Sequence, residues 1–499
     1  MSDKDDVLVL TTREKDWWWS MQEIFPAIER VWTSIGRCKP ENVRVLCLPL
    51  LPEIKQYVET STSTLKFVVL AAVTPQIVEI ALLLRSRRQV DVPMIIYVHG
   101  DSTEGFEAFG ELSSVLTEQD VFVVASESEA NATRLCFPEA QIKVIPFPLV
   151  SQYKLNGENR DNRRKVVRLA YVGRIAEQKN LHTLLFALWI LRNGRNPVPG
   201  ITLDIFGGES SPGSPMMGLA YGNYSSYLRE LAESLGVADA VTWHGMKSRD
   251  WLFYNVHMEP YIFVHPTLLS DENFGSSALA SLANGHQVVS TEWGGPRDWR
   301  EWFPGQLTLV PVRKSTKGPV VEPYSLADAI LRSIESSATV VAENTSLNRA
   351  RAEFSDSAVA ARTYQLIDTL DGPAVSLTKS PVLRHLDERR AMFGGARKIY
   401  SDYGDTAAQA FFEAYGMDEP LIFEEGESYI LAPWVSFSGQ NLRIDDPHRG
   451  RQEFCIDTEN SDTVEIMACP SMDEYHLPLY LVQELVVQGY AFPNPLAHS

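Results

Sequence analysis

The stretch LSDENFGSSALASLANG, from Leu269 to Gly285, decides how the second half of this chain is expected to fold. Residues 263–266 before it end an apolar run typical of a buried strand, and a helical run follows Phe274 and Gly275. Because Gly275 has no side chain, backbone amides at the helix start can approach an anion, which the helix dipole also favours. The stretch therefore predicts a phosphate-binding loop, although an ordinary glycine-punctuated strand, helix and strand would give the same pattern.

Short runs rich in Val and Ile recur along the chain and alternate with segments of helical period. The runs lie at residues 7–10, 66–71, 94–98, 121–125, 167–172, 202–206, 261–264 and 288–290. Such runs suit strands that are buried on both faces, and their alternation with helices predicts parallel sheets. We therefore expect an α/β, doubly wound fold.

Two breaks divide the chain. A polar stretch without periodicity at 150–165 separates an N-terminal half (1–155) from a second half (165–372), each large enough for a Rossmann-like sheet. Ligands of such twin folds bind outside the carboxyl ends of the strands, here in a cleft between the halves. After Asp371-Gly372-Pro373 the character changes, and residues 373–499 predict an α+β extension of unknown role. In the extension, helical patterns cover 382–415 and 479–488, and strand-like runs cover 428–431 and 463–467.

Charge and cysteine content narrow the function classes. A formal net charge of −19 argues against a nucleic-acid partner and against broad contact with an anionic membrane. We interpret the basic clusters at 85–88 and 160–168 as solvated ends or linkers, although the first could dock peripherally on lipid. The acidic start resembles no secretory signal, and the five scattered cysteines form no CxxC pair. We expect a cytoplasmic protein, with any membrane contact peripheral and on the inner face.

A second phosphate-binding pattern is YVGRIAEQKN, residues 171–180. A strand ends at Gly173, and the loop before the next helix carries Arg174 and Lys179. Two cations at the carboxyl end of a strand are suited to a diphosphate. A surface loop with two solvated cations is the alternative.

Together, these motifs resemble the second domain of GT-B glycosyltransferases of family 4. Residues 203–208 and 241–245 are similar to the family's "L-x-I-x-G-x-G" and "V-x-F-x-G" patterns, and 325–334 and 354–366 look like its closing helices. In the N-terminal half, His99 follows a strand where the family often has a histidine, and 123–126 and 142–146 resemble family strands. The resemblance implies a GT-B fold, with two Rossmann-like domains and an interdomain cleft.

The resemblance also implies an activity and a set of site residues. A sugar would pass from a nucleoside-diphosphate sugar to an unknown acceptor (a glycan, a lipid-linked group, a small molecule or a protein), with retention and without metal or cofactor. The catalytic candidates are Arg174 and Lys179 on the diphosphate, with Glu272 and His99 near the donor sugar. The donor-binding candidates are Gly173, Gly208, Glu209, Gly245, Met246, Asn273, Phe274, Gly275 and Ser276.

The sequence departs from the family in two places. Ala280 stands where the second glutamate of E-x7-E would hold the ribose, and Ser281, Asn273 or Glu209 could substitute for it. The usual glycine-rich loop after the first strand is absent, and residues 11–16 and three tryptophans at 17–19 replace it. These tryptophans suit a helix packed on the core or stacking against sugar rings. A sugar-nucleotide-binding or scaffolding protein without turnover is therefore the second hypothesis, and a partner-recruiting role of 373–499 is a third.

Overall fold

The structure is a computed structural model of the 499-residue chain, and its parts form two compact units. It describes residues 7–12, 21–38, 43–48, 65–88, 92–100, 110–148, 167–209, 223–252, 255–256, 260–270, 272–337, 348, 352–367, 370, 375–393, 405–438, 441–447, 450–456, 462–471 and 473–494. Unit 1 comprises Met1–Lys154, Asp271–Ser276 and Asn344–Ala396, and unit 2 comprises Leu155–Ser270, Ser277–Glu343 and Arg397–Ser499. Neither unit is continuous in sequence. The predicted boundaries at 155, 165 and 372 stay predictions, and most of the predicted break at 150–165 lies outside the described residues.

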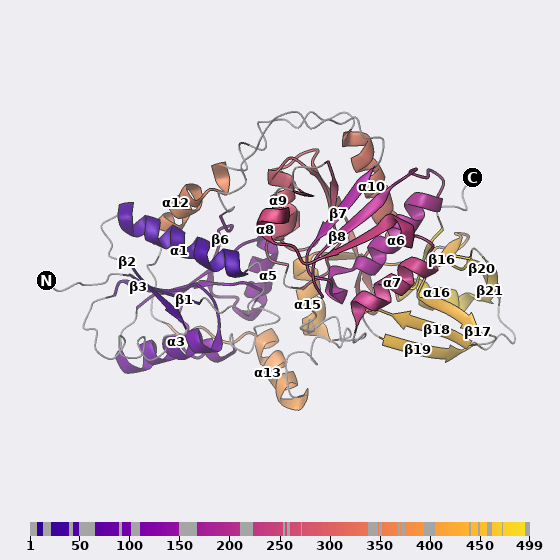
Figure 1. Cartoon of the computed structure of the whole chain (residues 1–499). Helices are drawn as coiled ribbons and strands as arrows, with labels where there is room; N and C mark the ends of the chain where they lie inside the picture. Colours follow the sequence, from indigo (N-terminus) through magenta and orange to yellow (C-terminus); the bar gives the residue numbers. More distant parts are fainter. Residues whose placement is uncertain are drawn as a thin grey trace. The chain divides into compact units, whose positions relative to one another are not determined.

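Unit 1 contains a six-stranded parallel sheet. Its strands lie in the order β2-β1-β3-β4-β5-β6, with β1 at Val7–Thr12, β2 at Val43–Leu48, β3 at Phe67–Leu70, β4 at Met94–Tyr97, β5 at Val121–Val124 and β6 at Gln141–Val144. The described residues of β1, β3, β4 and β5 are buried, as continuous apolar runs predict. Helices α1 (Met21–Cys38) and α3 (Pro75–Arg88) lie on opposite faces of the sheet (Figure 1).

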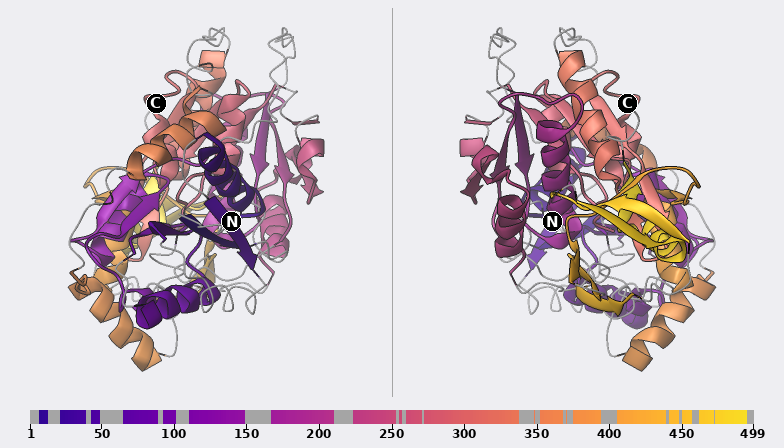
Figure 2. Two further views of the ribbon diagram at one scale, coloured as in Figure 1. Left: turned by 90° about the vertical axis from the view of Figure 1, so that its left-hand side faces the viewer. Right: turned by 90° about the vertical axis from the view of Figure 1, so that its right-hand side faces the viewer.

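Two helices from late in the sequence belong to unit 1. Helix α12 (Asp356–Ile367) lies beside α1 (Figures 1 and 2), and Arg30 Nε is 3.0 Å from the Asp356 carboxylate. Helix α13 (Pro381–Phe393) packs against α5 (Glu127–Cys136), and the Leu377 amide donates to the Leu116 carbonyl. In the predicted division of the chain, these helices fall in the second half (165–372) and in the C-terminal extension (373–499).

Unit 2 contains the second six-stranded parallel sheet. Its order is β12-β11-β10-β7-β8-β9, with β7 at Arg168–Val172, β8 at Thr202–Phe206, β9 at Val241–Gly245, β10 at Ile262–His265, β11 at Gln287–Thr291 and β12 at Leu307–Val310. The helices and 3-10 turns between these strands are η1 (Glu177–Lys179), α6 (Leu181–Asn193), α7 (Tyr224–Ser234), η2 (Ala238–Ala240), α8 (Arg249–Leu252), α9 (Ser276–Ala283) and η4 (Gly295–Trp299), and α10 (Pro323–Ser337) follows later in the chain. All eight predicted strand runs are present within a few residues.

Helix α6 explains why the last hundred residues join unit 2. Every residue from Leu181 to Leu191 is buried, and a helix that is apolar all round has to be covered on both sides. Helix α10 packs on α6, and the ring of Trp434 covers it at 5.2 Å from His182 and 6.4 Å from Phe186. The C-terminal strands (yellow) accordingly lie beside α6 in Figure 1.

The C-terminal part is α+β, as predicted, and is built into unit 2 by a shared sheet. Strand β15 (Met417–Pro420) pairs in parallel with β13 (Val312–Ser315), which pairs with β14 (Gly318–Val320). The remaining elements are α15 (Thr406–Tyr415), α16 (Leu479–Val487), a sheet of β16 (Tyr429–Leu431), β20 (Thr463–Met467), β21 (Glu474–Pro478) and β22 (Ala491–Pro493), and a sheet of β17 (Val435–Ser438), β18 (Asn441–Asp446) and β19 (Gly450–Cys455). The ring of Tyr415 stacks on Trp293 at 6.0 Å, which anchors α15 to the main sheet.

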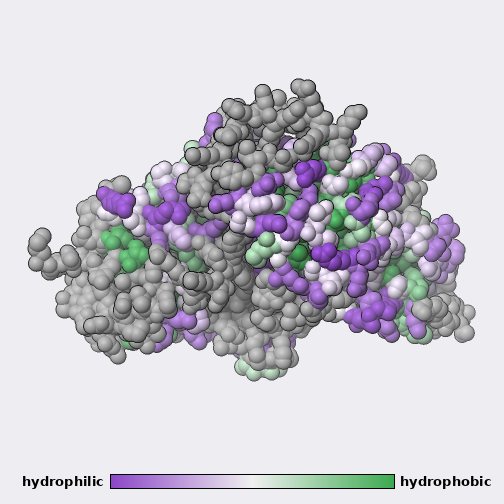
Figure 3. Space-filling view, in the orientation of Figure 1, coloured by the Kyte–Doolittle hydropathy of each residue, from purple (hydrophilic) through white to green (hydrophobic). Residues whose placement is uncertain are grey.

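On the face in Figure 3, hydrophilic residues (purple) predominate and hydrophobic ones (green) form small separate areas. None of the described helices is long and apolar enough to cross a membrane.

Gly416 provides a test of how the C-terminal part attaches. Its φ is +127°, and an added Cβ would lie 2.4 Å from the Glu292 carbonyl oxygen, whereas Gly426 (φ +90°) has nothing within 4 Å of that position. Both substitutions by alanine carry left-handed strain of about 1–2 kcal/mol. We expect Gly416→Ala to lower the free energy of unfolding by about 1–3 kcal/mol more than Gly426→Ala, measured by urea denaturation. Equal losses would contradict this attachment.

Candidate active site

The order of strands in unit 2 reverses between β7 and β10, and ligands of doubly wound sheets bind at the carboxyl edge of such a switch point. Two hydrogen bonds join the loops that leave these strands. The Leu268 amide donates to the Gln178 carbonyl at 2.8 Å, and Lys179 Nζ lies 3.4 Å from Thr267 Oγ1. Lys179 is 7% exposed. The candidate phosphate-binding lysine is therefore held directly at the switch point.

Three glycine turns lie side by side next to Lys179. The Gly173 amide donates to the Phe206 carbonyl, the Ile175 amide to the Gly208 carbonyl, and the Gly207 amide to the Gly245 carbonyl. A Cβ on Gly207 would lie 1.7 Å from the Gly173 carbonyl oxygen, so only glycine permits this approach. The turns after β7, β8 and β9 therefore form one continuous edge.

This edge gathers most of the residues predicted for the donor. It carries Gly173, Arg174, Gly208, Glu209 and Gly245, with Met246 beside them. The Tyr171 hydroxyl donates to the Arg174 carbonyl at 2.6 Å, which fixes the arginine turn. The Glu209 carboxylate is exposed and accepts from the Ser225 amide at 3.4 Å, at the start of α7. Met246 is 76% exposed. Cationic, acidic and apolar groups thus border one edge of the sheet.

His99 lies at the corresponding edge of unit 1. The strand order there reverses between β1 and β3, and His99 Nε2 donates to the carbonyl of Ala71, just after β3, at 2.8 Å. The imidazole packs edge-on against Phe25 at 5.5 Å and stacks on Phe147 at 5.2 Å. Burial among these groups lowers the pKa of His99 to about 4. The ring is therefore neutral at physiological pH, with its proton on Nε2.

The loop of residues 272–276 also belongs to unit 1. Asn273 Nδ2 donates to the buried Glu129 carboxylate at 3.3 Å, and the ring of Phe274 lies edge-on to Phe147 at 5.1 Å. Phe147 is thus sandwiched between His99 and Phe274. Glu272 is 8% exposed, Gly275 has a φ of +65°, and Ser276 begins α9.

The predicted residues therefore fall into two groups. Arg174, Lys179 and the glycine turns lie together in unit 2, and His99 lies with 272–276 in unit 1. Convergence of the two groups on one diphosphate stays a prediction. Sequence reasoning missed Glu129 and Thr267. The spacing Ser126-x-x-Glu129 was a usable signal, because it matches a helix capping box.

Comparisons with known proteins agree on a family for part of the chain and on a fold for most of it. Residues 157–303, less than a third of the chain, match the family described as "Glycosyl transferases group 1". Among solved structures, the lipopolysaccharide outer core galactosyltransferase WaaB in its apo form is 15% identical, with a TM-score of 0.51, covering 73% of this chain and 99% of that one. Anabaena HepE in complex with UDP gives 14% identity, a TM-score of 0.51, and coverage of 73% and 100%. A glycosyltransferase from Rickettsia africae gives 13%, 0.51, and coverage of 74% and 99%. No curated protein matches the sequence.

The fold is GT-B. The predicted fold class is thereby confirmed, and the group 1 match covers the loops after β7, β8, β9 and β10 that carry Lys179 and its neighbours. The structure also places Ala280, the position at which the resemblance predicts a second glutamate. Ala280 lies on α9, is 5% exposed, and accepts at its carbonyl from Asn284 Nδ2. The Ser281 hydroxyl donates to the Ser277 carbonyl at 3.1 Å, so it is engaged within the helix.

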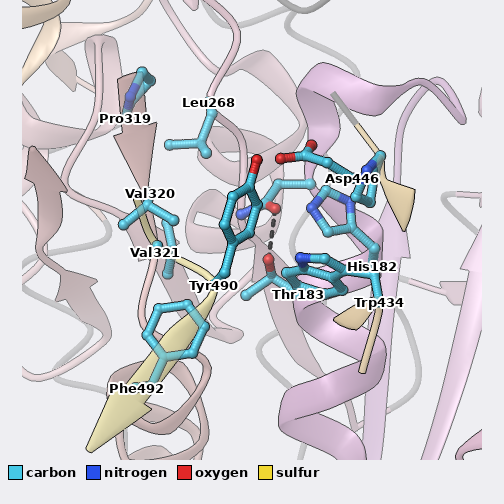
Figure 4. Close-up of a pocket in the computed structure, with 13 residues that line it drawn as sticks. His182, Thr183, Leu268, Pro319, Val320, Val321, Trp434, Asp446, Tyr490 and Phe492 are labelled. Carbon is cyan, nitrogen blue, oxygen red and sulfur yellow. Dashed lines mark hydrogen bonds between the residues drawn. The ribbon is translucent and has the colours of Figure 1, made fainter. Parts of the chain in front are cut away.

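A small pocket in unit 2 lies at the start of α6, where Asn180, His182 and Thr183 line it (Figure 4). It has a volume of about 20 Å³, and Asn180, Trp434 and Tyr490 are among its lining residues. This volume admits a water molecule but not a sugar. The Thr183 hydroxyl donates to Asn180 Oδ1 across one wall (dashed line). The pocket is therefore a junction between α6 and the C-terminal part, and not a donor site.

Other sequence motifs have structural partners. Arg85, of the basic cluster at 85–88, pairs with the buried Asp120 at 2.6 Å. Asp445 of β18 accepts from Arg443 and Arg451. Burial raises the pKa of the Cys136 thiol to about 12. The loop replacement at 13–16 and the tryptophans at 17–19 also lie outside the described residues.

The low pKa of His99 gives a pH prediction. An unfolded histidine has a pKa of about 6.5 and His99 in the folded chain about 4, so the folded state loses stability as the pH falls from about 6.5 to about 4. We expect the wild type to lose about 1–2 kcal/mol more than His99→Gln between pH 7 and pH 5, measured by urea unfolding. Parallel losses in the two proteins would show that the ring protonates freely.

Proposed function

We propose that this chain is a retaining, metal-independent glycosyltransferase of family 4 that moves a sugar from a nucleoside-diphosphate sugar to an acceptor. The observation that carries the proposal is the position of Lys179, bonded to Thr267 across the switch point inside the segment that matches glycosyltransferase group 1. The structural relative HepE was solved with UDP, which supports a nucleotide donor.

In this proposal the roles of the site residues follow from the negative charge that develops on the leaving diphosphate. Arg174 and Lys179 stabilise that charge, and the amides near Gly275 assist at the start of α9. Glu272 lies near the donor sugar. His99, neutral and with its proton on Nε2 directed to Ala71, lies near the donor sugar.

Glu209 is the strongest substitute for the glutamate missing at 280. Asn273 already donates to Glu129, and Ser281 is bonded within α9. The backbone of Glu209 instead forms an isolated β-bridge with Ile175, the neighbour of Arg174, and its carboxylate is exposed. Carboxylates accept hydrogen bonds from ribose hydroxyls, and this one lies on the same edge as the proposed diphosphate contacts. The donor ribose would then be bound by a carboxylate in the turn after β8.

The proposal also includes a location for the enzyme and the classes of acceptor. We propose a cytoplasmic enzyme with at most peripheral membrane contact, because a net charge of −19 disfavours anionic surfaces. A glycan, a lipid-linked group, a small molecule or a protein could be the acceptor.

Replacement of Lys179 tests the proposed function. The protein is incubated with a panel of nucleotide sugars, with and without cell extract, and released nucleoside diphosphate is measured. We expect release by the wild type and a loss of about a hundredfold or more in kcat/KM for Lys179→Ala, because one leaving-group contact is removed. The control Arg195→Ala removes an exposed cation from the same unit and should leave release unchanged.

Three outcomes would count against parts of this proposal. Binding of nucleotide sugars without release under any condition would favour a sugar-nucleotide-binding or scaffolding protein. Loss of activity in EDTA would contradict metal independence, and inversion of the anomeric centre in the product would contradict retention.

Glu209→Gln tests the ribose contact. Removal of the charged acceptor should raise KM for the donor by roughly tenfold, while kcat changes little, because the contact is equally strong in ground and transition states. Initial rates over a range of donor concentrations separate the two parameters. An unchanged KM would exclude Glu209 from the donor site.

A further inference from the structure

Glu129 is a buried carboxylate that joins three separate segments of unit 1. It is fully buried in the first turn of α5. Its Oε1 accepts from the Gly100 amide at 2.7 Å and from Asn273 Nδ2 at 3.3 Å, and its Oε2 accepts from the Ala125 amide at 3.0 Å. The three donors lie after β4, after β5 and in the loop before α9. One carboxylate thus fixes three loops at the same edge of the sheet.

This arrangement is more than helix capping. Ser126 is the N-cap of α5, and its hydroxyl accepts from the Glu129 amide at 3.3 Å, which is half of a capping box. In a complete box the glutamate would return to the amide of the N-cap residue. Glu129 instead directs both oxygens at residues outside α5. A buried carboxylate needs several donors to offset its loss of hydration, and here the loops supply them.

Two of the three loops held by Glu129 carry proposed site residues. Gly100 has a φ of +90° and directly follows His99. The hydrogen bond from the Gly100 amide to Glu129 therefore fixes the backbone that carries the imidazole. Asn273 lies between Glu272 and Phe274 in the segment 272–275, which we name the donor loop. The rings of His99, Phe147 and Phe274 pack in series beside this connection.

We propose that Glu129 is a positioning residue that sets the donor loop against the His99 loop for sugar transfer. The inference rests on the proposed function, because it concerns residues assigned to the donor there. Glu129 acts through Asn273 and Gly100 and does not itself touch the sugar. Its removal should therefore misplace Glu272 and His99 while the diphosphate contacts of Arg174 and Lys179, made in unit 2, persist.

Glu129→Gln is the variant that tests this inference. Glutamine has one acceptor oxygen and one NH₂ group, so either orientation turns a donor against Ala125 or against Gly100 and Asn273. We expect kcat to fall about tenfold to a hundredfold, since small misplacements of reacting groups cost that much, while KM for the donor stays within about threefold. Amide hydrogen exchange at Gly100 and Ala125 should also accelerate.

Two further variants make the test specific. Glu127→Gln places the same substitution on the exposed face of the same turn and should behave as wild type. Asn273→Ala removes only the donor-loop contact, and it keeps the inference testable if Glu129→Gln folds poorly. If Glu129 acts through Asn273, kcat of the double variant Glu129→Gln with Asn273→Ala falls no further than that of Glu129→Gln alone.

The outcomes separate this inference from the proposed function. A wild type that releases no nucleotide from any donor overturns both. An active wild type with Glu129→Gln and Asn273→Ala indistinguishable from Glu127→Gln overturns only the role of Glu129. A fall in kcat and a rise in donor KM by the same factor would assign Glu129 to general stability and would also overturn the inference.

Discussion

The hydrogen bond from the Leu268 amide to the Gln178 carbonyl holds together two loops that the order of strands directs apart. From β7 the chain continues to one side of the sheet, and from β10 to the other, and ligands of doubly wound sheets bind at such a switch point. Lys179 is 7% exposed there, and its Nζ lies 3.4 Å from Thr267 Oγ1. The long side chain is therefore held in place by the fold itself. Such preorganisation is what makes a cation effective toward charge that develops during a reaction.

Under the proposed function, Ala280 stands where a family 4 enzyme would have a glutamate that holds the ribose. A missing charged hydrogen bond costs about 1.5–3 kcal/mol, or roughly ten- to a hundredfold in donor affinity. In the proposed site that cost would fall on binding of the ribose, which does not change during transfer, and not on the diphosphate, where charge develops. The proposed leaving-group contacts of Arg174 and Lys179 do not involve α9, so Ala280 would lower donor affinity and leave them intact.

Much of the fold, and the position of Arg174 and Lys179 after a strand, could be predicted because the relevant signals are local. Runs such as 121–125 are buried on both faces, and Gly173 and Gly207 mark turns where backbones touch, so sequence alone places Arg174 and Lys179 at a strand end. The long-range contacts could not be predicted in this way. Nothing near Asn273 indicates Glu129, which is 144 residues away, and nothing near Asp356 indicates that α12 packs on α1. These partners depend on which surfaces remain uncovered after the sheets form.

The C-terminal part likewise packs on a surface that the second sheet and its helices leave uncovered. Helix α6 begins directly after Lys179 and Asn180, and its apolar surface extends all round. If the chain ended after the second sheet, a helix of this kind would expose its outer apolar face to solvent. The loop with Lys179 and Asn180, which precedes the helix, would then begin a less stable helix. Trp434 and the strands around it cover that face, while Tyr415 and Gly416 fit against Trp293 and Glu292. The described residues between 405 and 494 are thus part of unit 2 and help to cover α6, which follows the candidate phosphate-binding Lys179. A role of this part in choosing a partner or acceptor would come from its outer surface.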